Sequence, residues 1–171
     1  MRERNGLATF QGNPLTLLGE EPRLNQPAPD VELLTTSLEP VRLSSFKGKS
    51  LVVVAVPSLD TPVCDMETRT FNRKAAELGP DVVVLAVSMD LPFAQQRYCG
   101  AAGIDQVKTL SDHREGAFGE SYGVLIKGLR LLARSVFIID KNGVLRYQQI
   151  VPEVTQEPDY DAVLKALKAL V

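Results

Sequence analysis

Two continuous apolar runs dominate the hydrophobic pattern of the chain. Residues 51–56 read LVVVAV and residues 82–87 read VVVLAV, and both runs are rich in β-branched side chains. Continuous apolar runs of this length, as opposed to alternating ones, are typical of strands that are covered on both faces, as in a parallel sheet. The pattern therefore predicts two buried strands at these positions.

The segment between the two runs carries helix signals at both of its ends. Thr61 suits the N-cap position, and Pro62 suits the first helical position, where its missing N–H costs nothing. Gly79-Pro80 would end the helix. Strand, helix and strand then form a βαβ unit. An imperfect apolar stripe at helical spacing supports the helix and consists of Val63, Met66, Phe71, Ala75 and Leu78.

The same alternation of element types continues to the end of the chain. We expect a second helix that is capped by Asp90, carries Pro92 in its first turn and stops at Gly103. A short strand (VKTL) and a short helical or turn segment (REGAFGESYG) follow. The apolar runs around Lys141-Asn142-Gly143 predict a hairpin, because Asn-Gly is a strong turn signal. The final helix, over residues 159–171, has the clearest apolar periodicity in the chain.

The N-terminal part adds one further element. Residues 6–18 predict a hairpin whose turn is the Gly12-Asn13-Pro14 cluster, and a proline-spaced extended linker follows it. The resulting order is a hairpin, then β-α-β-α, a short insertion, and β-β-α. This order is that of the thioredoxin-like fold, so we expect an α/β domain over residues 1–171 with a central mixed sheet flanked by helices.

Composition and charge restrict the class of protein further. The 171 residues fit one domain, and 44% hydrophobic and 23% charged residues are typical of a globular protein. A formal net charge of −2 gives no electrostatic signature of nucleic-acid or anionic-membrane binding. The apolar runs are too short to cross a bilayer, and the basic start lacks the apolar segment of a signal peptide. We therefore expect a cytoplasmic protein.

Cysteine usage narrows the candidate chemistry. The two cysteines, Cys64 and Cys99, lie 35 positions apart, which does not make a disulfide scaffold. The sequence has no C-x-x-C, and its one histidine, His113, gives too few ligands for a zinc site. A papain-like hydrolase would need a histidine partner for its cysteine. We assign His113 to a loop or surface position without a role.

The predicted position of Cys64 favours a reactive sulfur. With Thr61 as the N-cap, Cys64 lies at the third helical position, where free N–H groups and the helix dipole stabilise a thiolate. Ligand sites in open α/β sheets also lie beyond the carboxyl ends of strands. Buried cysteines that only fill space are nevertheless common, so both interpretations remain open on local features. Cys99, near the end of the second helix, is by itself best explained as a small core residue.

Several longer segments carry a resemblance to a known family. Pro57, Thr61 and Cys64 form P-x-x-x-T-x-x-C, which resembles the active-site motif of peroxiredoxins. The surrounding string PSLDTPVCDMETRTFN is similar to the bacterial thiol peroxidases, also called atypical two-cysteine peroxiredoxins. The segments SMDLPFAQQRYCG, LSDHREGAFGESYGV and LLARSVFIIDKNG agree, so the likeness covers nearly the whole chain. Mild departures from the expected pattern are Tyr98 in place of Phe, Met66 after Asp65, and Ser135 in place of Ala.

The resemblance implies specific roles for five residues. Cys64 would be the peroxidatic cysteine, which attacks a hydroperoxide and becomes a sulfenic acid. Thr61 would hydrogen-bond the peroxide and the thiolate, Pro57 would shield the pocket, and Arg134 would stabilise the thiolate and polarise the peroxide. Cys99 would be the resolving cysteine, which forms an intramolecular disulfide with Cys64.

The resemblance also implies the partners of the reaction. The substrates would be hydrogen peroxide and alkyl or lipid hydroperoxides, and thioredoxin would reduce the disulfide. The protein would be a homodimer without a metal or prosthetic group. The alternatives are a thiol–disulfide oxidoreductase, which the lack of C-x-x-C disfavours, a redox sensor, and a protein whose two cysteines are inert.

The other charged residues near Cys64 are expected to form a solvated helix face, with i,i+4 pairing between Asp65 and Arg69. These residues are Asp60, Asp65, Glu67, Arg69 and Arg73.

Overall fold

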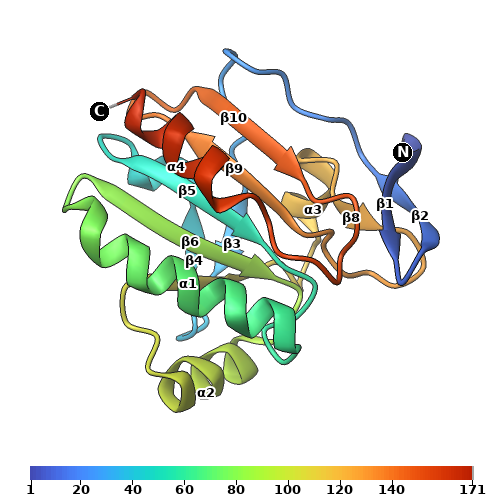
Figure 1. Cartoon of the computed structure of the whole chain (residues 1–171), viewed down its shortest axis with the longest axis horizontal. Coiled ribbons are helices and arrows are strands. Elements are labelled where there is room, and N and C mark those ends of the chain that lie inside the picture. Colours follow the sequence, from blue (N-terminus) through green and yellow to red (C-terminus); the bar gives the residue numbers. More distant parts are fainter. Residues whose placement is uncertain (171) are drawn as a thin grey trace.

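The chain folds into one large and one small β-sheet with helices around them (Figure 1). A computed structural model describes residues 1–170, and Val171 lies outside the described residues. The small sheet has the order β1-β2-β8 and the large one the order β10-β9-β5-β6-β7-β3-β4. The strands are β1 (Glu3–Phe10), β2 (Asn13–Leu18), β3 (Glu32–Leu34), β4 (Pro40–Arg42), β5 (Ser50–Ala55), β6 (Val82–Ser88), β7 (Val107–Ser111), β8 (Leu125–Ile126), β9 (Ser135–Ile139) and β10 (Leu145–Ile150).

The two apolar runs form adjacent strands at the centre of the large sheet. β5 pairs parallel to β6, with Leu51 opposite Val83, and β6 pairs parallel to β7. β9 runs antiparallel to β5, so the sheet is mixed. All six residues of β5 are buried. The predicted α/β fold of thioredoxin type, with its buried βαβ unit, is confirmed.

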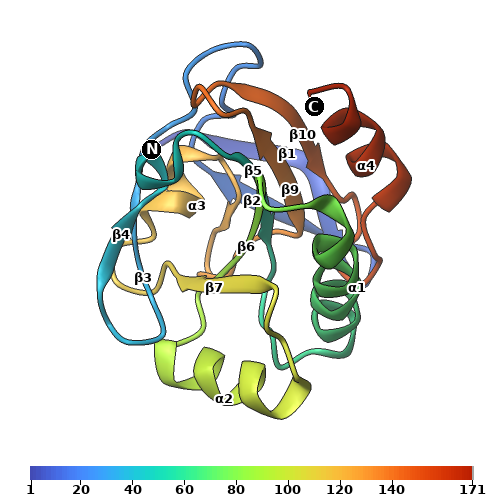
Figure 2. The same cartoon turned by 90° about the vertical axis from the view of Figure 1, so that its left-hand side faces the viewer.

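The large sheet has a hydrophobic core on each face, and the side chains of β5 alternate between them. Val52 and Val54 belong to the core under α1 (Pro62–Leu78) and α4 (Tyr160–Lys168). Leu51 and Val53 belong to the opposite core, which includes side chains of the small sheet and of α3 (Ala117–Ser121). Figure 2 shows α1 and α4 together on one side of the sheet and α3 on the other.

The helix α2 (Pro92–Ala102) lies apart from these layers. It lies beyond β7, at the bottom of Figure 2, and Pro92 and Gln95 are its buried residues. Gly103 ends it in the left-handed conformation, with its N–H donating to the Cys99 carbonyl, as the predicted stop requires. Within residues 1–170, no helix has both the length and the apolar character that a membrane span needs.

The observed elements differ from the prediction mainly in the N-terminal part of the chain. The N-terminal hairpin is present, but its strands start at residue 3 and its turn is Gln11-Gly12, whose φ angles are both positive. Asn13 and Pro14 are therefore strand residues. The linker contains β3, and together with β4 it forms a short antiparallel pair that the sequence did not reveal. The η1 turn (Leu43–Phe46) follows β4.

Candidate active site

Cys64 lies at the start of α1, as the sequence predicts. Thr61 is the N-cap residue with extended backbone, and Pro62 is the first helical residue. The Thr61 side chain, however, makes no capping hydrogen bond to the helix, so this part of the prediction is wrong. The Thr61 hydroxyl donates to the Ser58 carbonyl at 2.9 Å instead of accepting a bond from the helix. The Ser58 carbonyl also accepts from the Thr61 N–H at 3.3 Å, so the turn before the helix holds this carbonyl against the residue. The first turn of α1 therefore keeps N–H groups that can stabilise an anion.

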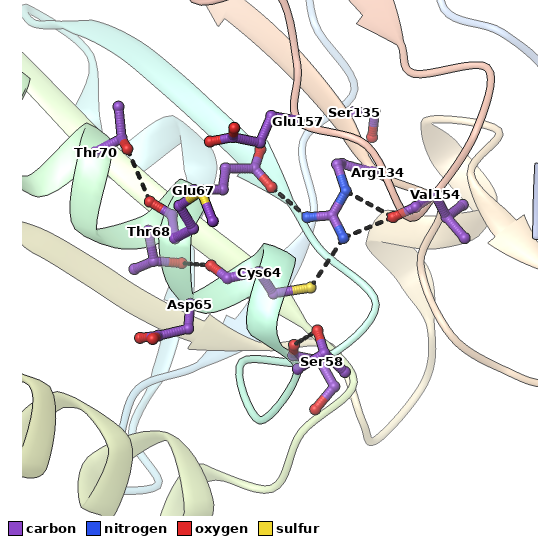
Figure 3. Close-up of polar contacts among 12 residues, drawn as sticks. Ser58, Cys64, Asp65, Glu67, Thr68, Thr70, Arg134, Ser135, Val154 and Glu157 are labelled. Carbon is purple, nitrogen blue, oxygen red and sulfur yellow. Dashed lines mark hydrogen bonds and ion pairs between the residues drawn. The ribbon is translucent and has the colours of Figure 1, made fainter.

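The sulfur of Cys64 is fully buried and faces a guanidinium group (Figure 3). Arg134 Nη2 donates to Cys64 Sγ at 3.2 Å, although the two residues are 70 positions apart in sequence. The sheet register explains this contact. Arg134 directly precedes β9, and Ser135 at the start of β9 pairs with Ala55 at the end of β5. The loop that leads to Cys64 therefore begins at the same end of these two paired strands at which Arg134 lies.

Arg134 is held on three sides by hydrogen bonds. Its Nε and Nη2 both donate to the Val154 carbonyl, at 3.0 and 2.8 Å, and its Nη1 donates to the Glu67 carboxylate. Only 1% of the residue is exposed. Burial alone would lower the pKa of Arg134, but the charges on Glu67 and Cys64 raise it overall. The guanidinium is thus a fixed cation in contact with the sulfur and is placed to stabilise negative charge there.

Glu67 is a site residue that sequence reasoning placed wrongly. It was expected on a solvated face, but its side chain is fully buried and pairs with Arg134. Burial raises the pKa of Glu67 to about 7, against the opposing effect of Arg134 and with a smaller contribution from Glu157. The other carboxylate oxygen, Oε1, makes no hydrogen bond to any residue among 1–170. The spacing could have indicated that Glu67 is a site residue, because it lies three residues after Cys64, which places both on one helix face.

The buried face of α1 is therefore different from the predicted stripe. Met66 was expected in the core but is 51% exposed, because it lies on the opposite side from Cys64 and Phe71. The buried residues of α1 are Cys64, Glu67, Thr68, Thr70 and Phe71.

The remaining predicted site residues divide into two groups. Pro57, which is half-buried, and Thr61, which is exposed, lie in the loop between β5 and Cys64. Cys99 is half-buried on α2, and its sulfur lies 3.6 Å from Thr109 Oγ1 on β7. Burial raises the pKa of the Cys99 thiol, and the Thr109 hydrogen bond opposes the shift. The two cysteines form no disulfide with each other. The structure therefore brings Arg134 into contact with Cys64, whereas Cys99 contacts Thr109 on β7.

Asp90 does not cap α2 as predicted, because other donors occupy its carboxylate. The N-cap residue is Leu91. The Asp90 side chain instead accepts bonds from Ser58 Oγ at 2.7 Å, Leu59 N at 2.8 Å and Ser88 Oγ at 2.7 Å. Asp90 therefore connects the loop before Cys64 to the end of β6.

The arrangement suits nucleophilic chemistry by sulfur. A thiolate stabilised by a helix N-terminus and a buried arginine can attack an electrophilic atom without a general base. The same guanidinium can stabilise negative charge that develops on a leaving oxygen. Among residues 1–170, no three His, Cys, Asp or Glu side chains cluster in a way that would hold a metal ion.

Comparisons with known proteins agree with this chemistry. The Redoxin family model matches residues 23–164, a range that contains both cysteines and Arg134. The chain is 55% identical to a thiol peroxidase of Bacillus subtilis (strain 168) over 163 residues, which cover 95% of this chain and 97% of that protein. It is 52% identical to a thiol peroxidase of Halalkalibacterium halodurans over 161 residues, 94% of this chain and 96% of that one.

Solved structures show a similar likeness. The crystal structure of a peroxiredoxin-like protein from Aquifex aeolicus matches with a TM-score of 0.91 at 42% identity and covers 100% of both chains. A thiol peroxidase from Chromobacterium violaceum matches with a TM-score of 0.85 over 95% of each chain. At 22% identity, this second likeness bears on the fold alone.

Proposed function

Because this chain belongs to the thiol peroxidases of the redoxin family, we propose that it reduces hydrogen peroxide and organic hydroperoxides through Cys64. The observation that carries the proposal is the contact between the buried Cys64 sulfur and Arg134 Nη2 at 3.2 Å. A fixed cation at the start of a helix is what a sulfur needs to remain ionised and reactive.

In the first step, the Cys64 thiolate attacks the distal oxygen of the hydroperoxide. The S–O bond forms as the O–O bond breaks, so that Cys64 becomes a sulfenic acid and the leaving oxygen becomes water or an alcohol once it is protonated. Arg134 stabilises the charge on the leaving oxygen. Thr61 would orient the peroxide with its hydroxyl, which turns away from Ser58 to do so. Pro57 would shield the sulfur from solvent.

In the second step, the Cys99 thiol condenses with the sulfenic acid, and water leaves as the disulfide forms. Cys99 lies against Thr109 in the present arrangement, so this step requires a local rearrangement of α2. Thioredoxin would then reduce the disulfide by thiol exchange. The family likeness supports alkyl and lipid hydroperoxides as substrates, and a cytoplasmic homodimer as the working form.

Intact-mass measurement after one equivalent of hydrogen peroxide tests the proposal. The unmodified protein should lose two hydrogens, and Cys99→Ser should instead gain one oxygen. Cys64→Ser should keep its mass. In an assay with thioredoxin, its reductase and cumene hydroperoxide, NADPH consumption should depend on Cys64. A Cys64→Ser protein that still turned over peroxide would refute the proposal.

A further inference from the structure

One hydrogen bond joins the immediate neighbours of the two cysteines. The Tyr98 hydroxyl donates to Asp65 Oδ1 at 2.6 Å. Asp65 directly follows Cys64 on α1, and Tyr98 directly precedes Cys99 on α2. A rearrangement of the backbone at either cysteine would therefore also displace one partner of this hydrogen bond.

Arg69 adds a second connection between the same helices. Its Nε donates to Asp65 Oδ1 at 2.8 Å, and its Nη1 donates to the Ala102 carbonyl at the end of α2, at 3.2 Å. The same carboxylate oxygen thus accepts from Tyr98 of one helix and from Arg69 of the other. Asp65, Arg69 and Tyr98 together form what we term the interhelix cluster.

The interhelix cluster lies across an open groove and not within a packed interface. A groove of about 430 Å³ separates this part of α1 from α2, and Thr61, Ala101 and the three cluster residues are among those that line it. Tyr98, Cys99 and Ala102 of α2 also pack, partly buried, against the core cluster that contains Cys64, so the polar contacts of the interhelix cluster add to this packing. Burial raises the pKa of Tyr98, with the Asp65 hydrogen bond as a further cause, so the hydroxyl remains a donor at neutral pH.

We propose that the hydrogen bond from Tyr98 to Asp65 is a latch that must open before Cys99 can reach Cys64. The inference rests on the proposed function. Disulfide formation joins the two sulfurs at about 2 Å, with Cα atoms roughly 4.4–6.8 Å apart. The Cys99 sulfur now contacts β7, so α2 must unwind or turn, and Tyr98 moves with it.

The latch would determine the fate of the sulfenic acid on Cys64. Condensation with the Cys99 thiol releases water and gives the disulfide. Attack on a second hydroperoxide instead transfers another oxygen to Cys64, gives the sulfinic acid and releases water or an alcohol. A closed latch slows only the first of these reactions, so its strength sets how much enzyme is over-oxidised in each turnover.

Tyr98→Phe tests the latch, because phenylalanine keeps the ring but removes the donor. Rapid-quench intact mass separates oxidation of Cys64 from disulfide formation. We expect disulfide formation to accelerate about fivefold, the effect of losing one ordinary hydrogen bond. Over-oxidation at high peroxide should fall in proportion, while the rate of Cys64 oxidation stays unchanged. Tyr147→Phe is the matched control, since the Tyr147 hydroxyl accepts from Gln149 on β10, at the far side of the sheet from α2.

Asp65→Asn gives a second test that keeps the tyrosine. It weakens the acceptor, so it should accelerate disulfide formation less than Tyr98→Phe does, and the double variant should be no faster than Tyr98→Phe alone. A Tyr98→Phe protein that forms the disulfide at the original rate or more slowly overturns the latch. An unmodified protein that forms no disulfide at all overturns the proposed function instead, so the two failures are distinguishable.

Discussion

Cys64, Arg134 and Glu67 share one buried positive charge. Arg134 donates to the sulfur and to the carboxylate at the same time, and both acceptors are fully buried. One cation cannot neutralise two buried anions, so one of them holds a proton more tightly than it would in water. Burial raises the pKa of Glu67 to about 7, because Arg134 opposes this shift only in part, and Oε1, which has no hydrogen-bond partner among residues 1–170, is a position for the proton.

Replacement of Glu67 by glutamine should change how stability depends on pH. The pKa of Glu67 is raised from 4.5 to about 7 in the folded protein, so the folded state holds the proton more tightly than the unfolded chain does. The free energy of unfolding of the parent protein should therefore fall as the pH rises from 4.5 to 7. Glutamine does not titrate, so Glu67→Gln should gain up to about 3 kcal/mol relative to the parent across this range.

Urea denaturation at pH 5 and at pH 8, followed by circular dichroism, measures this difference. Glu39→Gln is the matched control, because Glu39 is exposed in the turn between β3 and β4 and should show no such trend. If the stability gap between Glu67→Gln and the parent were the same at both pH values, Glu67 would titrate alike in the folded and unfolded states, and the conclusion that burial raises its pKa would be wrong.

The N-terminal hairpin supports the active site through the segment that holds Arg134. Thr9 in β1 exchanges backbone hydrogen bonds with this segment: its N–H donates to the Pro152 carbonyl at 2.8 Å and its carbonyl accepts from Val154 N–H at 2.9 Å. Glu153 accepts from the Thr9 hydroxyl at 2.8 Å and from Gly12 N–H at 2.9 Å. The Val154 carbonyl, fixed in this way, accepts both bonds from Arg134.

Glu153→Ala should therefore slow the oxidation of Cys64, although Glu153 does not touch the site. The loss of its hydrogen bonds frees the Val154 carbonyl to move, and a less well fixed arginine should cost about three- to tenfold in rate. Stopped-flow measurement with hydrogen peroxide gives this rate, and Glu153→Gln should recover part of it because an amide oxygen can still accept. An unchanged rate in Glu153→Ala, with faster hydrogen exchange at Gly12 showing that the hairpin had loosened, would contradict the connection.

The elements that the sequence predicts well are those whose signals are local. The two apolar runs form most of β5 and β6, the Asn142-Gly143 turn joins β9 to β10, and the final helix is observed as α4, which begins at Tyr160. β3 and β4 were missed because three residues are too few to establish a period, and their pairing depends on distant neighbours.

The errors at the site have a different physical origin. Sequence reasoning placed Glu67 in solvent because charged residues are seldom buried, and a burial that depends on Arg134 cannot be read from the helix alone. Asp90 was expected to cap α2, but Ser58 and Leu59, more than thirty residues earlier, provide better donors. Arg134 itself was identified only through the family resemblance, since no local pattern connects it to Cys64.

At the scale of the whole molecule, the site lies between the buried cores and a helix with few fully buried residues. On the face of the sheet opposite α1, the rings of Phe118, Tyr122 and Phe137 pack with centroids 4.4 to 6.0 Å apart, all fully or nearly fully buried. The Tyr122 hydroxyl donates to the Pro29 carbonyl at 2.7 Å, which fastens the linker to this core. Cys64 and Arg134 are fully or nearly fully buried, whereas Cys99 is half-buried on α2, a helix in which two residues are buried.

Hydrogen exchange before and after oxidation should reveal this division. Because the disulfide requires Cys99 to leave Thr109, oxidation by one equivalent of peroxide should lower the protection of α2 amides about tenfold or more, and that of the first turn of α1 to a smaller degree. Amides of β5, β6 and β9 should keep their protection, because the two cores around them do not take part in the rearrangement. Peptide-level mass spectrometry measures both regions in one experiment, with Cys99→Ser as the control that oxidises without forming the disulfide. Loss of protection in the central strands, or none in α2, would mean that the cysteines meet by some motion other than a local opening of α2.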